Sequence, residues 1–487
     1  MEWSAHGAAQ SLGRTARLTL ILLAVILPAL SLNAQDEPLN RFGAVESFWL
    51  PEAACELGVG WERIIFDWAQ HQPNSPNDWN TLNVDDRWLQ AAQDCDREVV
   101  AVVKHTPAWA TDGLPNAGVP RGLYLPVDDP GNLWAGFMRR AAEYYATRGV
   151  SRFIIWNEPD IPAGTYGFIF AGSLDDYFQL LKVASIAAHQ GNPEARIHVA
   201  GTTYWHDVNN DRPLYVDRLL DRIAADPEAP AHGDYFDALT VHVYFRTDTV
   251  YDITRANIEA LERHGMGDKE VWIVETNASP NLDPAWRVER PNWQITLEQQ
   301  SAFLTQAAAL GLAAGADRIA VYKLFDWSLP AGAESFGLIR ADQTRRPAFD
   351  AWRTVITELE DVAEASLARV PEVNVVWLRY EESWGTLIAW SRTAEPVEFE
   401  ISLVSRGRTT SAILIGSDGQ ELPLRSVDGN FRLVLPGAIC NAVDGCAVGG
   451  QPVIFRFPEL LSSTAIIVGG ERKWIEFGPL QPLAPTA

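Results

Sequence analysis

Eight short apolar runs alternate with amphipathic stretches between about residue 41 and about residue 360. Within the amphipathic stretches, apolar residues recur at spacings of three and four, which is typical of helices that bury one face. Eight strands that alternate with helices over roughly 320 residues are the pattern of a (β/α)₈ barrel. The strands are expected at 41–46, 61–68, 98–105, 152–158, 196–202, 238–245, 270–276 and 318–327.

A doubly wound parallel sheet is the main alternative, because it shows the same alternation of strands and helices. Such a sheet normally carries a glycine-rich nucleotide-binding turn after an early strand. The sequence contains no GxGxxG, P-loop or GxSxG pattern. We therefore favour the barrel. Its clearest helices are expected at 132–149, 173–190, 256–265 and 296–315.

The pattern changes after about residue 365, where helical periodicity stops and short β-rich runs follow. Turn signals separate these runs, among them Asp428-Gly429, a strong hairpin signal. This part is expected to be an all-β, sandwich-like domain, and the Pro-rich end is expected to be mobile. The predicted organisation is a barrel over 35–364, a β-sandwich domain over 365–475 and a flexible tail over 476–487.

The N-terminus has the features of an export signal. Arg14 and Arg17 precede an apolar run at 18–32 that is short for a membrane span. Ala34 then offers the small residue that a signal peptidase prefers. We expect a signal peptide over 1–34 and a secreted or periplasmic protein without a membrane partner, although an uncleaved anchor stays open.

Export also permits disulfide bonds, and the chain has four cysteines. Cys440 and Cys446 flank an Asp-Gly turn that can bring them together. Cys55 and Cys95 each precede an apolar strand and are expected on neighbouring helices. Both pairs are predicted to be disulfides. No CxxC, HxH or HExxH pattern indicates a metal site, so neither a metal nor another cofactor is expected.

Composition limits the class of partner. The chain has 39 Lys and Arg against 63 Asp and Glu, a formal charge of −24. Nucleic acids and anionic membranes need basic surfaces, so neither is an expected partner. The 19 Trp, 12 Tyr and 19 Phe offer flat rings that can stack on sugars, which favours a carbohydrate substrate. Nothing in the sequence indicates an oligomeric state.

Two glutamates follow apolar runs at the ends of expected strands. Glu158 ends the fourth strand, in FIIWNE, and Glu275 ends the seventh strand, in VWIVE. The carboxyl ends of barrel strands meet at one mouth, where active sites lie. A single glutamate at a strand end is more often a solvent-exposed loop residue. Two carboxylates that face each other, one protonated and one ionised, are the apparatus that cleaves glycosidic bonds.

The motifs around both glutamates resemble those of clan A glycoside hydrolases. With the trailing β domain, they are most similar to glycoside hydrolase family 39 and its relatives, the β-xylosidase and α-L-iduronidase group. Asp160 departs from that family, whose motif usually reads NEPN. The similar segments are RIIFDW (63–68), VVKHTPAWA (102–110), WNEPD (156–160), FDALTVHVYF (236–245), VWIVETNAS (271–279) and FGLIRADQTRRPAFDAW (336–352).

This resemblance implies that Glu158 is the general acid/base and Glu275 the nucleophile of a retaining glycosidase. It also implies supporting or substrate-binding roles. The implied residues are Asn157 for the sugar 2-OH, Tyr244 and His242 beside the nucleophile, Arg63 to keep it ionised, and Trp327 as an aromatic platform.

Several further residues near strand ends are weaker candidates. Trp109 and His105 are predicted to line the cleft, although packing roles are equally good interpretations. Asp160 is expected to be a loop acid or a distal sugar contact. Pro159 is expected to hold Glu158 in an extended conformation, because proline disfavours the helical region for the residue before it. Three cations are candidates to hold a uronate carboxylate: Arg121, Arg246 and Lys323.

The leading hypothesis is therefore a secreted retaining glycoside hydrolase. It would cleave O-glycosidic bonds by double displacement through a covalent glycosyl-enzyme, with exo-action on β-xylosides or related short glycans. The alternative is a non-catalytic carbohydrate-binding protein on a glycosidase-like barrel. The presence of both glutamates together with their supporting residues favours the enzyme.

Overall fold

The computed structural model describes residues 40–483, apart from 328, 331, 381–384, 404–410, 427–428, 459–460 and 469. The predicted signal segment at 1–34 therefore lies outside the described residues. Within the described part of the chain, no helix is both long enough and apolar enough to cross a membrane.

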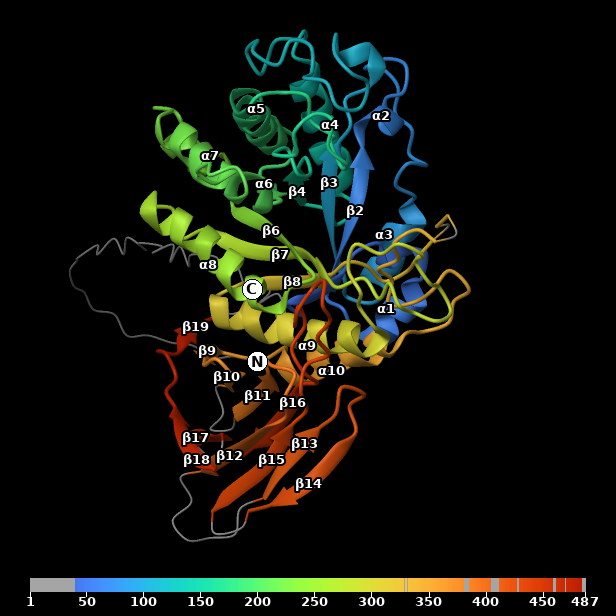
Figure 1. Cartoon of the computed structure of the whole chain (residues 1–487). Coiled ribbons are helices and arrows are strands. Elements are labelled where there is room, and N and C mark those ends of the chain that lie inside the picture. The colour runs from blue at the N-terminus through green and yellow to red at the C-terminus, as the bar shows by residue number, and fades with distance from the viewer. Residues whose placement is uncertain are drawn as a thin grey trace, which may run out of the picture. The chain divides into compact units, whose positions relative to one another are not determined.

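Eight parallel strands close into a barrel in the order β1 to β8 (Figure 1), which confirms the predicted fold class. These strands are buried over most of their length, as expected where helices cover a parallel sheet. The strands are β1 (Phe42–Ala44), β2 (Trp61–Asp67), β3 (Glu98–Lys104), β4 (Arg152–Ile155), β5 (Arg196–Thr202), β6 (Ala238–Tyr244), β7 (Glu270–Asn277) and β8 (Arg318–Val321).

Helices connect these strands and cover the outside of the barrel. Capping boxes at Ser173 and Thr296 begin the two longest, α5 and α9. Gly315 ends α9 in the left-handed conformation that glycine adopts without strain. The α-helices are α1 (Pro51–Leu57), α2 (Trp68–His71), α3 (Asp86–Gln93), α4 (Leu133–Ala146), α5 (Leu174–Gly191), α6 (Trp205–Val208), α7 (Tyr215–Ala224), α8 (Thr247–Arg263), α9 (Leu297–Ala314) and α10 (Pro347–Leu359). Short 3-10 helices are η1 (Ser47–Trp49), η2 (Ala108–Ala110) and η3 (Ala229–Tyr235).

Side chains fill the part of the barrel interior that lies away from the carboxyl ends of the strands. Trp61 and Trp272 lie there with ring centroids 5.1 Å apart, and Arg318 lies over the Trp272 ring. Small and β-branched residues from the other strands complete this floor. They are Val45, Val100, Val102, Ile154, Ala238, Val274 and Ala320. The floor closes the barrel from below, so a ligand can enter the interior at the carboxyl ends of the strands.

Two barrel strands end at least three residues earlier than the sequence predicts. β4 stops at Ile155 instead of 158, and β8 stops at Val321 instead of 327. In both cases the polar residues beyond the strand belong to turns that lie at the barrel mouth. The apolar runs alone predicted the strands correctly, but not the points where the backbone turns away.

Antiparallel strands follow the barrel, as predicted, and form two sheets in the orders β14-β13-β16-β11-β10-β9-β19 and β15-β12-β17-β18. Four of these strands were not predicted: β9, β17, β18 and β19. Their bounds are β9 (Glu364–Arg369), β10 (Val373–Arg379), β11 (Gly385–Ser391), β12 (Val397–Leu403), β13 (Ser411–Ile415), β14 (Glu421–Arg425), β15 (Asn430–Leu435), β16 (Val453–Phe457), β17 (Leu461–Val468), β18 (Glu471–Ile475) and β19 (Gln481–Pro482).

Part of the tail that was predicted to be mobile is hydrogen-bonded. β19 pairs with β9 in antiparallel fashion, and the Leu483 N–H donates to the Ala363 carbonyl at 2.9 Å. The Pro-rich composition gave no sign of this pairing, because a two-residue edge strand leaves no alternation to detect.

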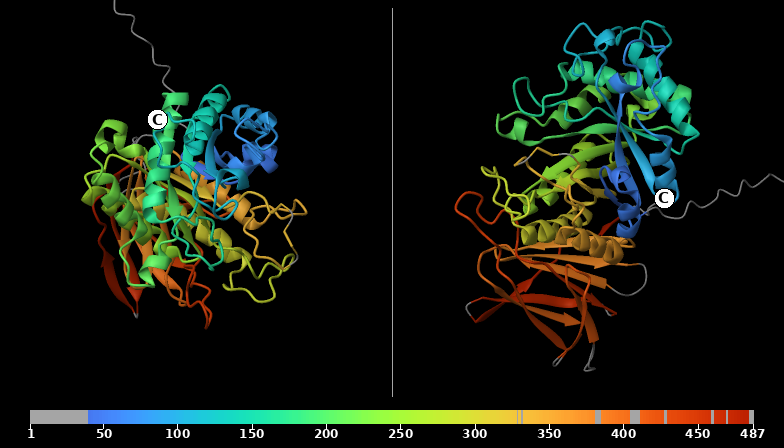
Figure 2. Two further views of the ribbon diagram at one scale, coloured as in Figure 1. Left: turned by 90° about the horizontal axis from the view of Figure 1, so that it is seen from above. Right: turned by 90° about the vertical axis from the view of Figure 1, so that its right-hand side faces the viewer.

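The seven-stranded sheet is tied to the barrel through helices α8 and α9, and Figure 2 shows its strands beside α9 and α10. Asp248, in the first turn of α8, accepts hydrogen bonds from Asn374 at 2.7 Å and Arg392 at 2.8 Å. Gln306 of α9 donates to the Gly450 carbonyl at 2.7 Å. These contacts bury α9 on nearly all sides, which explains its largely apolar sequence.

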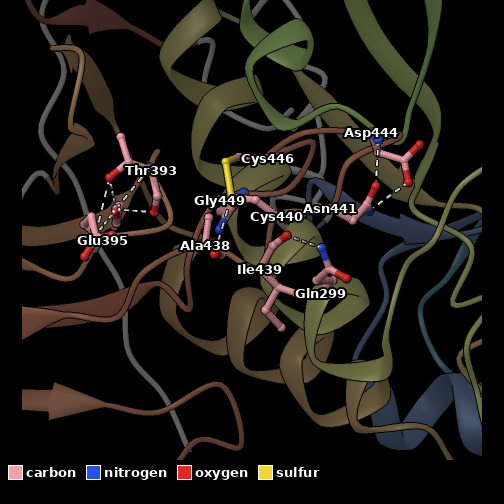
Figure 3. The surroundings of a disulfide bond; sticks show 12 residues. Gln299, Thr393, Glu395, Ala438, Ile439, Cys440, Asn441, Asp444, Cys446 and Gly449 are labelled. Atoms are coloured by element: carbon pink, nitrogen blue, oxygen red, sulfur yellow. Dashed lines mark hydrogen bonds between the residues drawn. A yellow bond between two sulfur atoms is a disulfide. The ribbon is translucent and has the colours of Figure 1, made fainter.

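Both predicted disulfides are present. Cys55 of α1 is bonded to Cys95, which follows α3, and Cys440 is bonded to Cys446 (Figure 3). Within the second loop, Asp444 accepts the Gln294 N–H at 2.8 Å. A loop from the C-terminal sheets therefore supports the segment that follows β7 in the barrel.

The two disulfides should differ in their effect on stability. Replacing Cys55 and Cys95 together by serine removes a cross-link across 40 residues, whereas the Cys440–Cys446 bond spans only 6. Loop-closure entropy predicts losses in the free energy of unfolding of about 4 and about 2 kcal/mol, respectively. Urea unfolding of the two double variants and of the wild type measures both losses in the free energy of unfolding. A larger loss for the variant without the Cys440–Cys446 bond would contradict the prediction.

Candidate active site

A cavity of about 660 Å³ opens at the carboxyl ends of the barrel strands. This volume lies within the range of small-ligand sites in proteins. Asn157 and several aromatic rings, including Tyr166, Tyr244, Phe245 and Tyr322, form part of its wall. Its charged lining residues are Glu46, Arg63, Lys104, Glu158, Glu275, Lys323, Asp326 and Glu334. Both glutamates singled out in the sequence therefore face one cavity.

Glu275 is buried near the end of β7, and two donors hold its carboxylate. Arg63 of β2 donates to Oε1, and the Tyr244 hydroxyl, from β6, donates to Oε2. Burial alone would raise the pKa of Glu275, but the charges of Arg63 and His242 and these hydrogen bonds outweigh it and lower the pKa to about 2. Glu275 is therefore ionised at neutral pH.

His242 of β6 lies between the two glutamates. Its Nδ1 is 2.8 Å from Oε1 of Glu158 and 3.6 Å from Oε2 of Glu275. An ionised carboxylate can only accept a hydrogen bond, so in that state of Glu158 the Nδ1 atom carries the proton. An oxygen of Glu158 and an oxygen of Glu275 lie within 4.8 Å of each other around this ring.

Irregular strand pairing places His242 next to Glu275. The register between β6 and β7 shifts between Val241 and His242, after which His242 pairs with Glu275. Such bulges commonly redirect side chains near functional sites. Gly201 of β5 then makes room for the imidazole, because a Cβ atom at this position would lie 2.3 Å from the His242 ring.

Backbone strain is concentrated at the mouth of the barrel. His105, Trp156, Glu158 and Phe245 each follow a strand and have φ values of 70°, 75°, 41° and 66°. Side chains other than glycine rarely adopt such values, and strained residues of this kind cluster at functional sites. The backbone at the strand ends is thus bent to direct side chains into or around the cavity.

The expectation that Pro159 keeps Glu158 extended is wrong. Glu158 has a φ of 41°, and its N–H donates to the Gly201 carbonyl at 3.0 Å. Asp160 stabilises the same turn, because one of its carboxylate oxygens accepts both the N–H and the hydroxyl of Thr203, at 2.9 and 2.6 Å. These tertiary hydrogen bonds override the local preference, and they assign the loop role to Asp160.

Three of the predicted substrate-binding residues, Trp109, His105 and Trp327, lie outside the cavity wall. The Trp109 indole donates to the Gln72 carbonyl at 2.6 Å, and Nδ1 of His105 lies 2.7 Å from Asp67. Trp327 stacks on Trp49, with ring centroids 4.6 Å apart. These contacts fit packing and positioning roles, and the substrate-binding roles of the three residues stay predictions.

Some residues of the cavity wall were missed by the sequence analysis, notably Lys104, Glu46 and Tyr166. For Lys104 a signal existed: Val100, Val102 and Lys104 alternate along β3, so all three side chains point into the barrel. For Tyr166 none existed, since it lies in an irregular loop after β4.

Glu158, His242 and Glu275 together offer ligand atoms close enough for a metal ion to use. Arg63 and Tyr244 already donate to both oxygens of Glu275, and a guanidinium beside a metal cation is repulsive. This donor set fits a hydrogen-bonded ionic network better than a metal centre. The expectation that no metal is needed stays a prediction.

No protein-family model matches the chain, and no curated protein matches it. Solved structures with a similar fold include a family 39 glycoside hydrolase from the gut symbiont Bacteroides cellulosilyticus. That protein is 15% identical to this chain, with a TM-score of 0.64, and the match covers 86% of this chain and 81% of that one.

Two further structures extend this likeness. A β-xylosidase from Caulobacter crescentus is 13% identical, with a TM-score of 0.56 and coverage of 86% of this chain and 95% of that one. A family 30 endoxylanase from Clostridium papyrosolvens is 13% identical, with a TM-score of 0.56 and coverage of 87% and 97%. The expected resemblance is thereby confirmed at the level of structure: the chain has the fold of clan A glycoside hydrolases.

Proposed function

We propose that the chain is a retaining glycoside hydrolase that cleaves O-glycosidic bonds through a covalent glycosyl-enzyme. The closeness of Glu158 and Glu275 carries this proposal, because one carboxylate oxygen of each residue lies within 4.8 Å of the other. Retaining glycosidases hold their two carboxyl groups about 5–5.5 Å apart. Inverting enzymes need about 6.5–9.5 Å, so that a water molecule fits between them.

In this proposal Glu275 is the nucleophile. Its low pKa keeps it ionised, and its Arg63 and Tyr244 contacts hold the carboxylate in one orientation. Attack on the anomeric carbon forms the glycosyl-enzyme ester and breaks the bond to the leaving oxygen. As negative charge leaves Glu275 in this step, its attraction to Arg63 weakens. The ion pair thus favours departure of Glu275 when the ester is hydrolysed.

Glu158 is proposed to be the general acid and then the general base. His242 is bonded to its Oε1, which leaves Oε2 to protonate the leaving oxygen. Its side chain is 22% exposed, against 10% for Glu275, so water from the cavity mouth can reach it in the second step. Asn157, which lines the cavity wall beside it, is proposed to bind the sugar 2-OH.

The substrate is proposed to be a short glycan that is cleaved from one end. The barrel floor closes the cavity below the glutamates, and a closed cavity suits the terminal sugar of a chain. A β-xylosidase and an endoxylanase are among the similar structures, so β-xylosides are the first substrates to test.

Secretion is part of the proposal. The two disulfides fit an oxidising compartment, and the predicted signal peptide at 1–34 supplies the route. Cleavage of this segment can be read directly by N-terminal sequencing of the exported protein.

Replacing either glutamate by glutamine should remove most of the activity. Glu275→Gln should show no turnover of aryl glycosides, since an amide cannot attack the anomeric carbon. Glu158→Gln should lower kcat about 10²–10⁴-fold on glycosides with poor leaving groups, because proton donation is lost. Exposed Glu194 lies at the other end of the barrel, so Glu194→Gln should retain wild-type rates.

Trapping the intermediate separates the two roles. A 2-fluoroglycoside inactivator should label Glu275 and leave Glu158 unmodified, as peptide mass spectrometry can show. Activity in the presence of a chelator, measured in parallel, checks that no metal is needed. Unchanged rates in either glutamine variant, or a label on Glu158, would contradict the assignment.

Removing the charge of Arg63 should shift the pH dependence of activity. Arg63 holds the pKa of Glu275 at about 2, so Arg63→Met should raise that pKa and move the acid limb of kcat/KM to higher pH. Arg63→Lys keeps the charge and should shift the limb less. If the acid limb of Arg63→Met matches the wild type, Arg63 does not control the ionisation of Glu275.

A further inference from the structure

Most charged groups in the cavity wall have an ionic or hydrogen-bonding partner within the protein. Arg63 is paired with Glu275, and Lys323 is paired with Glu46 at 3.0 Å. Asp326 is paired with Arg346 at 2.7 Å. The remaining acids have polar partners: Glu158 has His242, and Glu334 accepts a hydrogen bond from Asn281 at 2.9 Å.

Lys104 is the exception among the described residues of the wall. No ion pair or hydrogen bond holds its ammonium group in the described part of the chain, and the half-buried side chain lines the cavity. Burial lowers the pKa of Lys104, and the nearby positive charge of Arg63 lowers it further. A cation that faces a cavity and has no partner in the protein is available to an anionic group of a ligand.

The position of Lys104 relates it to the reacting sugar. It ends β3, where it pairs in register with Asp67 of β2, and it points into the cavity above Val102. The negative charges of Glu275 and Glu158 both act on it. A sugar ring that is bound against both glutamates therefore lies within the field of this ammonium group.

We propose that Lys104 is a specificity-determining residue that binds an anionic substituent, a carboxylate or a sulfate, on the sugar whose glycosidic bond is cleaved. The inference rests on the proposed function and narrows its substrate class to acidic sugars. An anionic group would give Lys104 the partner that the protein itself does not provide. Charge-assisted hydrogen bonds of this kind are about twice as strong as neutral ones.

The three cations that the sequence suggested for such a role have other interaction partners within the protein. Arg121 is paired with Asp112 at 3.0 Å, and Lys323 with Glu46. Arg246 lies over the Trp293 ring, 4.9 Å from its centroid. Neither arginine is part of the cavity wall. The structure thus transfers the role from these residues to Lys104.

The proposal is tested by the binding of matched sugars to the wild-type protein. Calorimetry should compare D-glucuronate with D-glucose, D-galacturonate with D-galactose, and D-mannuronate with D-mannose. The 6-sulfates of the three hexoses distinguish a sulfate from a carboxylate. At least one acidic sugar should bind about 10- to 100-fold more tightly than its neutral partner. Lys104→Met, which keeps the length of the side chain without its charge, should abolish this difference.

A matched control measures the effect of net charge alone. Lys473 is paired with Glu372 at 2.9 Å on the C-terminal sheets, so Lys473→Met should keep the full preference for the acidic sugar. Stability gives a second readout. Because Lys104 lacks a partner, Lys104→Met should unfold at the same temperature as the wild type or higher, whereas loss of a structural ion pair would lower it.

Turnover then separates this inference from the proposed function. The 4-nitrophenyl β-D-xyloside, β-D-glucoside and β-D-glucuronide differ only in the group at C5. Acid-selective binding without hydrolysis of any glycoside would overturn the proposed function and leave the role of Lys104 intact. Hydrolysis with no preference for any acidic sugar, or a preference that survives in Lys104→Met, would overturn the role of Lys104 alone.

Discussion

A carboxylate as buried as Glu275 stays ionised only if its surroundings replace the water that it has lost, and Arg63 is the largest single contributor to this replacement. The two residues come from β7 and β2, so the ion pair forms only when the barrel has closed. Tyr244 and His242 add a hydrogen bond and a further electrostatic contribution from β6. The fold thus pre-organises the proposed nucleophile before any substrate binds, which is how electrostatic catalysis avoids reorganisation in the reaction.

The second glutamate is placed by local irregularity instead of by a regular strand. β4 ends at Ile155, and the strained turn at Trp156 and Glu158 then bends the chain toward β5. Gly201 holds this turn through its carbonyl and makes room for His242, which links the two glutamates. A small set of tertiary contacts therefore fixes the separation between the carboxylates.

The barrel could be predicted because its signal is local: eight apolar runs, each long enough to identify a buried strand. The same logic found Glu158 and Glu275, since each directly follows such a run. The conformation of Glu158 could not be predicted in this way, because its hydrogen bond to Gly201 joins two distant strands. That Lys104 lacks a partner could not be predicted either, because this depends on which of the other charged residues in the cavity wall pair with one another. β19 was missed because its pairing is entirely nonlocal.

The stereochemistry of the first-formed product distinguishes double displacement from single displacement. In the proposed mechanism, the short separation of Glu158 and Glu275 leads to two successive displacements at the anomeric carbon. Proton NMR of a β-glycoside undergoing hydrolysis should therefore show the β-anomer of the released sugar first, with the α-anomer appearing only as it mutarotates. Initial release of the α-anomer would mean single displacement by water and would exclude a glycosyl-enzyme intermediate.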